Sequence, residues 1–194
     1  MQKTLINLTK AFIGESQARN RYDFYAKIAR KEGYEKIGNI FALTAEQEKE
    51  HAKRLFEHIQ ELKEKLNETS NEITTEGLSP NTYGTTAENL KAAMAGENFE
   101  YTQLYPEFAK VAKEEGLDKI ADRLLAIAKA EEHHEERYKK LLAHVEAGTM
   151  FERDQEVWWV CMECGYVHFG TQAPEKCPSC DHAQAFYEFK SEDY

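Results

Sequence analysis

The sequence predicts a mainly α-helical protein in which a four-helix bundle precedes a small C-terminal domain of strands and loops. Three observations lead to this prediction. Apolar residues recur at helical spacing in four long segments, a polar connector divides these segments into two pairs, and all four cysteines lie in the last fifth of the chain. Each helix is expected to bury one apolar stripe against the other three.

The composition limits the class of protein. The chain has 194 residues, of which 41% are hydrophobic and 31% charged, and these values suit long helices that each bury one face. The net charge of −10, without any cluster of Lys and Arg, argues against a nucleic-acid partner. The sequence has neither a run of about 18 apolar residues that would span a membrane nor an N-terminal signal segment. We therefore expect a cytoplasmic protein with no membrane partner.

The four apolar stripes define the expected helices, and each repeats every three or four residues. They run from Leu5 to Ala29, from Ile37 to Leu66, from Leu90 to Val111 and from Ile120 to Val145. Gly33 lies between the first two stripes and Gly116 between the last two, as glycines that end helices do. Because both turns are short, each pair of helices should form an antiparallel hairpin.

The two pairs are separated by residues 67–88, a segment rich in Thr, Ser, Asn and Gly that contains Pro80 and has no helical period. Two helical hairpins joined by one long crossover form the ferritin-like bundle. After Gly148 the pattern changes to a short apolar strand, cysteines and aromatic residues. We therefore predict a ferritin-like domain over residues 1–147 and a small β/loop domain over residues 148–194.

The two halves of the predicted bundle resemble each other. Glu48 and His51 recur 83 positions later as Glu131 and His134, whereas the Gly14-Glu15 pair recurs 82 positions later as Gly96-Glu97. The third helix must therefore contain one extra residue, after Glu97 and before Tyr105. An inserted residue in a helix often produces a π-bulge, and Pro106 should bend the same stretch.

Acidic residues and histidines interrupt the apolar stripes at one depth in all four helices: Glu15, Glu48, His51, Glu97, Glu100, Glu131 and His134. Unpaired buried carboxylates are costly and repel one another, and bound cations remove both problems. One Glu from two helices plus Glu-x-x-His from the other two is the ligand pattern of di-iron carboxylate proteins. The alternatives are a solvated acidic face on each helix, or zinc in place of iron.

Glu100 differs from the other six residues, and two tyrosines are further candidates for this site. Glu100 has Ala18 as its counterpart in the first half, so the duplication does not account for it. It is either an additional ligand, bound in one oxidation state only, or a polar residue at the bundle edge. Tyr22 and Tyr105 lie one to two turns from the lone glutamates, where they can hydrogen-bond carboxylates or serve as plain core tyrosines.

The C-terminal cysteines form two pairs, Cys161-x-x-Cys164 and Cys177-x-x-Cys180, separated by twelve residues. Two facing Cys-x-x-Cys loops build a tetrahedral thiolate site, and in a reducing compartment this spacing indicates a metal rather than disulfides. Gly165 lets backbone amides approach sulfur, which tunes a redox metal. Spacing alone does not choose between iron and zinc, so a zinc ribbon remains an alternative.

These motifs resemble the rubrerythrin family along nearly the whole chain and in the same domain order. The resemblance is carried by Gly14–Arg19, Glu46–His51, Gly96–Tyr101, Glu131–His134 and the Cys-x-x-Cys-Gly-Tyr and Cys-Pro-x-Cys knuckles. At one position the chain departs from the pattern, since Asp181 follows Cys180 where free-standing rubredoxins usually have Gly.

The resemblance implies two iron ions in the bundle and one iron in a rubredoxin-like site of four cysteines. It assigns bridging roles to Glu48 and Glu131 and terminal ligand roles to Glu15, Glu97 and His134. It also implies that one iron exchanges Glu100 for His51 on reduction. The implied activity is the reduction of hydrogen peroxide to water in oxidative-stress defence, by a head-to-tail homodimer that receives electrons from rubredoxin or a pyridine-nucleotide-dependent reductase.

We therefore expect Glu100, His51, Tyr22 and Tyr105 to act in catalysis, with Glu100 supplying protons to the departing oxygen. Three rival functions remain. A ferroxidase would use the same bundle with oxygen and free ferrous iron, an electron carrier or redox sensor would keep the bundle iron structural, and a zinc-ribbon adaptor would dock a partner.

Overall fold

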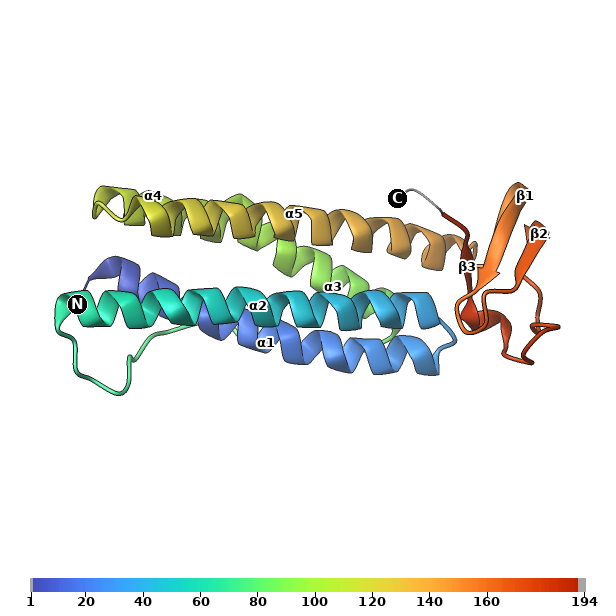
Figure 1. Ribbon diagram of the computed structural model, residues 1–194, viewed down its shortest axis with the longest axis horizontal. Coiled ribbons are helices and arrows are strands. Elements are labelled where there is room, and N and C mark those ends of the chain that lie inside the picture. The colour runs from blue at the N-terminus through green and yellow to red at the C-terminus, as the bar shows by residue number, and fades with distance from the viewer. Residues whose placement is uncertain (1, 192–194) are drawn as a thin grey trace.

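The computed structural model describes residues 2–191 and confirms a long helical bundle with a small three-stranded module at one end (Figure 1). The third bundle helix consists of three consecutive segments, named α3, η1 and α4. The bundle elements are α1 (Lys3–Lys31), α2 (Glu35–Leu66), α3 (Thr86–Phe99), η1 (Glu100–Leu104), α4 (Tyr105–Glu114) and α5 (Asp118–Ala147).

Both helical hairpins turn where the sequence predicts. Gly33 follows α1 with a φ of +85° and Gly116 follows α4 with a φ of +72°, a backbone region that glycine enters without steric cost. The crossover that follows α2 runs back along the bundle before α3 begins near the α1–α2 turn (Figure 1). Within the described residues, no helix is both long and apolar enough to cross a membrane.

Each hairpin turn also caps a helix of the other half. Glu32 accepts a hydrogen bond of 2.9 Å from the backbone N–H of Thr86, in the first turn of α3. Its counterpart Glu115 accepts two bonds of 3.0 Å from the N–H groups of Lys3 and Thr4, which begin α1. A carboxylate at a helix N-terminus satisfies unpaired donors and opposes the positive end of the helix dipole. The two halves, which resemble each other in sequence, therefore contact each other in the same way, since the equivalent residues Glu32 and Glu115 each cap a helix of the other half.

The inserted residue of the third helix produces the predicted π-helical segment. Over η1 the helix widens, and the N–H of Tyr105 bonds to the carbonyl of Glu100, five residues before it. Pro106 follows in the first turn of α4, where a missing N–H is tolerated. The π-helix therefore starts at Glu100, the carboxylate that has no counterpart in the first half.

Two apolar clusters fill the bundle on either side of a polar middle layer. One, toward the Gly116 turn, is built around Leu8, Leu55 and Leu124, and the other, toward the C-terminal module, contains Phe41 and Tyr138. The five residues are buried. The metal-ligand candidates lie between these clusters, so apolar side chains exclude water from both ends of the layer.

The C-terminal module contains β1 (Glu152–Cys161), β2 (Val167–Gln172), the short helix η2 (Gln184–Phe186) and β3 (Tyr187–Phe189). Its antiparallel sheet has the order β2-β1-β3, with Trp159 paired to His168 on one side and to Phe189 on the other. The module sits against the α1–α2 turn. A 2.5 Å ion pair joins Lys36 to Glu188 there. The boundary between residues 147 and 148 remains a prediction.

Candidate metal centre

Two groups of metal-ligand atoms meet in the middle of the bundle and share two carboxylates. The first group comprises Glu15, Glu48, His51 and Glu131, and the second comprises Glu48, Glu97, Glu131 and His134. In each group the donor atoms all lie within 4.8 Å of one another. Each of the four bundle helices contributes at least one donor, so the site exists only when all four are packed.

The shared glutamates each direct one oxygen to each histidine. His51 Nδ1 lies 2.9 Å from Glu48 Oε2 and 2.9 Å from Glu131 Oε1. His134 Nδ1 lies 3.1 Å from Glu48 Oε1 and 2.8 Å from Glu131 Oε2. Two ligand atoms at right angles, each about 2.1 Å from one ion, are about 3 Å apart. The spacing therefore fits two ions bridged by two carboxylates.

Most of the donor residues keep at least one buried atom without a hydrogen-bond partner in the described part of the chain. Among the donor residues these atoms are Glu15 Oε2, Glu48 Oε1, Glu97 Oε2, both carboxylate oxygens of Glu131 and His134 Nδ1. Orphaned buried oxygens of this kind are destabilising unless a cation accepts their lone pairs. The four bundle glutamates of these groups are no more than 1% exposed, so the alternative of a solvated acidic face is wrong.

The packed charges shift the pKa values of the donors in opposite directions. Burial, and then the charge of Glu48, raises the pKa of Glu97 to about 8. Burial alone would raise the pKa of Glu48, but His134 and His51 outweigh it and lower that pKa to about 2. Burial alone would lower the pKa of His134, yet Glu131 and Glu48 raise it to about 11. Without metal, protons must therefore balance the negative charge.

We expect the metal-free protein to lose thermal stability as pH rises from 6.5 to 8. The folded state keeps a proton on Glu97 between pH 4.5 and about 8, and on His134 between pH 6.5 and about 11, whereas the unfolded chain releases both. Folding therefore binds protons throughout this window. Circular dichroism melts in chelator should show a falling melting temperature, and iron should flatten the dependence because it replaces the protons. A melting temperature that rises over this window would contradict the assignment.

Two tyrosines connect the lone glutamates across the two halves. Tyr22 of α1 donates a 2.5 Å hydrogen bond to Glu97 of α3, and Tyr105 of α4 donates one to Glu15 of α1. Both tyrosines are buried. Each half thus orients a lone carboxylate of the other, and of the two alternatives left open by the sequence the structure shows the hydrogen bonds. Their role in catalysis stays a prediction.

Replacing either tyrosine with Phe should weaken one metal position and leave the other unchanged. Tyr22→Phe frees Glu97 in the second group, and Tyr105→Phe frees Glu15 in the first. Loss of such an outer partner typically lowers metal affinity about 10- to 100-fold. Iron titration against a competing chelator should show one weakened site in each variant, with the two variants serving as controls for each other. Equal weakening of both irons in both variants would refute the pairing.

Glu100 lies outside both donor groups. It begins η1, it is half-buried, and no hydrogen bond or ion pair joins it to another described side chain. Burial, and then the charge of Glu97, raises its pKa well above the usual range of a carboxyl group. The structure thus places His51 in the first group and Glu100 beside it, and the ligand role of Glu100 stays a prediction.

The four cysteines converge in the C-terminal module. Cys161 Sγ lies 3.7 Å from Cys180 Sγ, and Cys164 Sγ lies 3.7 Å from Cys177 Sγ. Four sulfurs about 2.3 Å from one ion at tetrahedral angles are about 3.8 Å apart. All four thiols are free of disulfides. The predicted tetrahedral thiolate site is therefore present.

The two cysteine loops have the same backbone geometry. After each pair the chain adopts a left-handed conformation, with φ of +75° at Gly165 and +63° at Asp181. The N–H of Gly165 bonds to the carbonyl of Cys161, and the N–H of Asp181 to that of Cys177. Asp can occupy this region, although glycine does so more readily. Replacement of the usual Gly by Asp at position 181 therefore preserves the loop.

Only some of the nearby aromatic residues shield the cysteines. Trp159 and Tyr187 are fully buried with Cys161 and Cys177. Trp158 is 49% exposed on the opposite face of the sheet. Its cross-strand partner Phe169 lies on the same face and is equally exposed. These two aromatic side chains therefore do not shield the metal site.

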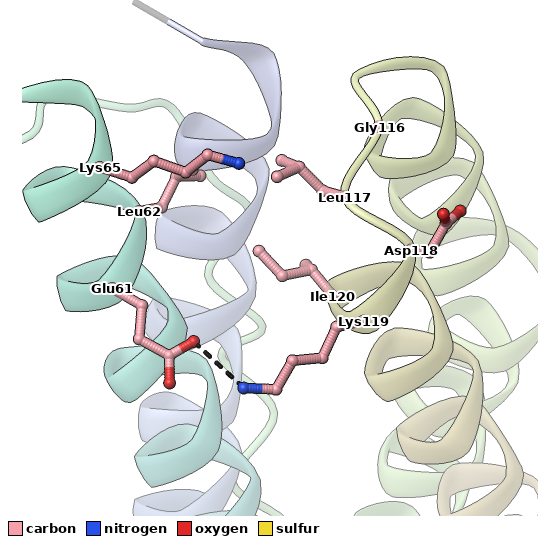
Figure 2. Close-up of a pocket in the computed structure, with 8 residues that line it drawn as sticks. All are labelled: Glu61, Leu62, Lys65, Gly116, Leu117, Asp118, Lys119 and Ile120. Carbon is pink, nitrogen blue, oxygen red and sulfur yellow. Dashed lines mark ion pairs between the residues drawn. The ribbon is translucent and has the colours of Figure 1, made fainter.

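Two features of the bundle are not evident from the sequence, one beside the metal centre and one remote from it. Tyr138 was visible as a member of the fourth stripe, but its place in the site was not foreseen. It is buried beside Tyr22 at a ring distance of 5.7 Å, one turn after His134. A pocket at the far end of the bundle, between α2 and the α4–α5 turn, contains an ion pair of 3.6 Å between Glu61 and Lys119 (Figure 2). No member of a donor group lines that pocket, so we assign it no function.

Fold and sites together define a non-haem iron protein, in which a ferritin-like bundle holds a carboxylate-bridged pair of irons and a rubredoxin-like module holds a third. The family model described as Rubrerythrin matches residues 7–142. The model of the rubrerythrin rubredoxin-like domain matches residues 159–188. The chain belongs to the rubrerythrin family, and its metal sites are iron sites of that family.

Similar proteins support this membership over the full length. A putative rubrerythrin of Methanocaldococcus jannaschii is 58% identical over 100% of this chain and 96% of its own length. The rubrerythrin of Porphyromonas gingivalis is 52% identical over 99% of this chain and 92% of its own length. A solved structure of fully reduced, all-ferrous nigerythrin is 32% identical, covers 96% of this chain and 86% of its own, and has a TM-score of 0.64.

Proposed function

We propose that this protein reduces hydrogen peroxide to water in the defence against oxidative stress. The observation that carries the proposal is the pair of donor groups sharing Glu48 and Glu131, on a chain that also holds a four-cysteine site. Peroxide takes up two electrons and two protons to give two waters. A pair of ferrous ions supplies both electrons together and polarises the oxygen atoms.

The side chains around the metal centre hold the ligand carboxylates in place and deliver protons. Tyr22 and Tyr105 hold the two terminal carboxylates in place through their hydrogen bonds. Glu100 is the proton donor in this proposal, because it lies outside both groups and because burial raises its pKa, which favours the protonated carboxyl group. The arrangement with His51 among the donors and Glu100 outside them is the one that the family resemblance assigns to the reduced state.

The position of the four-cysteine site favours electron transfer between two chains. Lys36 contacts the module, and Glu48 lies twelve positions further along α2, a distance of about 18 Å along the helix axis. His51 exposes 17% of its side chain at a surface pocket that Arg54 and Arg123 also line. We propose that the module of a second copy docks at this pocket, which gives a head-to-tail homodimer. Rubredoxin or a pyridine-nucleotide-dependent reductase would reduce the iron of the module again in the cytoplasm.

A rapid-mixing experiment with the iron-loaded, reduced full chain tests the function. Iron analysis should give about three irons per chain, and the red colour of the oxidised four-cysteine site should disappear on reduction. One equivalent of peroxide should oxidise the bundle irons faster than oxygen does. Slow oxidation by peroxide would favour an electron carrier or redox sensor instead.

A ferroxidase or iron-storage role is the second candidate. It predicts that excess ferrous iron is oxidised by oxygen over many turnovers without a donor. The four-cysteine site on the same chain is unnecessary for that reaction and favours the peroxidase. Sustained oxidation of ferrous iron by oxygen, at a rate above that of donor-linked peroxide reduction, would overturn the proposal.

A further inference from the structure

Two glycines occupy equivalent places beside the lone glutamates of the metal centre. Gly14 precedes Glu15 in α1, and Gly96 precedes Glu97 in α3, 82 positions later. Both lie inside helices and neither has a positive φ. Glycine has no side-chain carbon, so both positions leave open space beside a lone glutamate.

The space beside the two glycines differs. A Cβ added to Gly96 would meet no other atom within 4 Å. A Cβ added to Gly14 would have a single neighbour, the Oε1 atom of Glu100, at 4.0 Å. The two glycines therefore differ in one respect, which is the carboxylate beside Gly14. In the other half the counterpart of Glu100 is Ala18, so Gly96 has no such neighbour.

Of the seven acidic residues and histidines that the sequence indicates for the metal centre, all of them described, Glu100 alone lies outside both donor groups. No hydrogen bond or ion pair holds its carboxylate to another described side chain, and it is half-buried. Its side chain is thus untethered in the position beside Gly14. Any residue with atoms beyond Cβ at position 14 would compete with it for that space.

We propose that Gly14 is a positioning residue that keeps open the space in which the Glu100 carboxylate lies when it is outside the metal centre. The glycine lets the carboxylate leave the donor groups and return to them. A larger side chain at position 14 would push the Glu100 carboxylate out of this space. The inference rests on the proposed function only where it predicts a change in peroxide turnover.

Valine is the most informative replacement, since its two γ-carbons fill both of the χ1 positions that a helix allows. Gly14→Val should lower peroxide turnover about 100-fold, the cost of misplacing a reacting group by about 1 Å. Gly96→Val is the matched control and should leave turnover unchanged. Gly14→Ala should also leave it unchanged, because a Cβ at 4.0 Å is an ordinary contact.

A double-mutant cycle separates an effect through Glu100 from a general disturbance of the site. In a Glu100→Ala background, Gly14→Val should cause no further loss of turnover. Equal losses in both backgrounds would overturn the proposal, as would unchanged turnover in Gly14→Val alone. Melting temperatures of the metal-free variants should not fall below that of the parent, which excludes misfolding.

A structural readout keeps this inference separate from the proposed function. Crystal structures of the metal-free parent and of Gly14→Val should show the Glu100 carboxylate beside position 14 in the parent only. A carboxylate that stays in place in the variant would overturn the inference, whatever the turnover. If the parent itself fails to reduce peroxide, the proposed function falls, and displacement of the carboxylate would still support the role of Gly14.

Discussion

Replacing both Cys161 and Cys164 with Ser is expected to abolish steady-state peroxide reduction by an external donor, with a loss of about 100-fold or more. Even the loss of an outer partner of a metal ligand costs about 10- to 100-fold, and here two of four ligands are removed. The variant module should hold no iron and the protein should lack the red colour. Donor oxidation and iron content measure both effects.

The reduced bundle irons of the same variant should still be oxidised by peroxide in a single turnover. A chemically reduced sample mixed with one equivalent of peroxide should be oxidised at the rate of the parent protein, because the donor groups lie in the bundle. Glu163→Gln is the matched control. This exposed acid lies inside the first cysteine loop and should keep both iron and turnover. Loss of the single reaction in the double Ser variant would show that the two iron sites do not work separately.

Glu100→Ala should slow peroxide turnover about 10²- to 10⁴-fold, the range that positioned proton transfer contributes. The variant should bind two bundle irons, because Glu100 lies outside both donor groups. Stopped-flow oxidation of the reduced protein and metal analysis measure the two quantities. Glu107→Ala removes an exposed acid of the same bundle helix and should behave as the parent. Parent-like turnover in Glu100→Ala would remove Glu100 from the mechanism.

The sequence was sufficient to predict the donor sets, because metal chemistry restricts both residue type and spacing. Glu48 and His51 had to share one helix face, and a carboxylate on an otherwise apolar stripe has few explanations besides a cation. The π-helix at Glu100 was predictable for a related reason: the two halves differ by one residue between Glu97 and Tyr105.

Contacts between distant elements could not be predicted in the same way. The carboxylates of Glu32 and Glu115 read as ordinary surface charges, and nothing in their local pattern shows that each caps a helix of the other half. The exposure of Trp158 and Phe169 depends on which face of the sheet covers the cysteines, and composition does not fix this choice. Strand alternation becomes informative only when the register is known.

The reciprocal tyrosine and carboxylate contacts would, in two identical halves, give two chemically equivalent iron positions. One inserted residue in the third helix, together with Glu in place of Ala at position 100, removes that equivalence. Two metals bound there would face different surroundings, and an exchange of Glu100 for His51, which the family resemblance implies, would be open to only one of them. A modest alteration of one repeat is thus enough to turn a symmetric metal-binding scaffold into a site whose two halves perform different tasks.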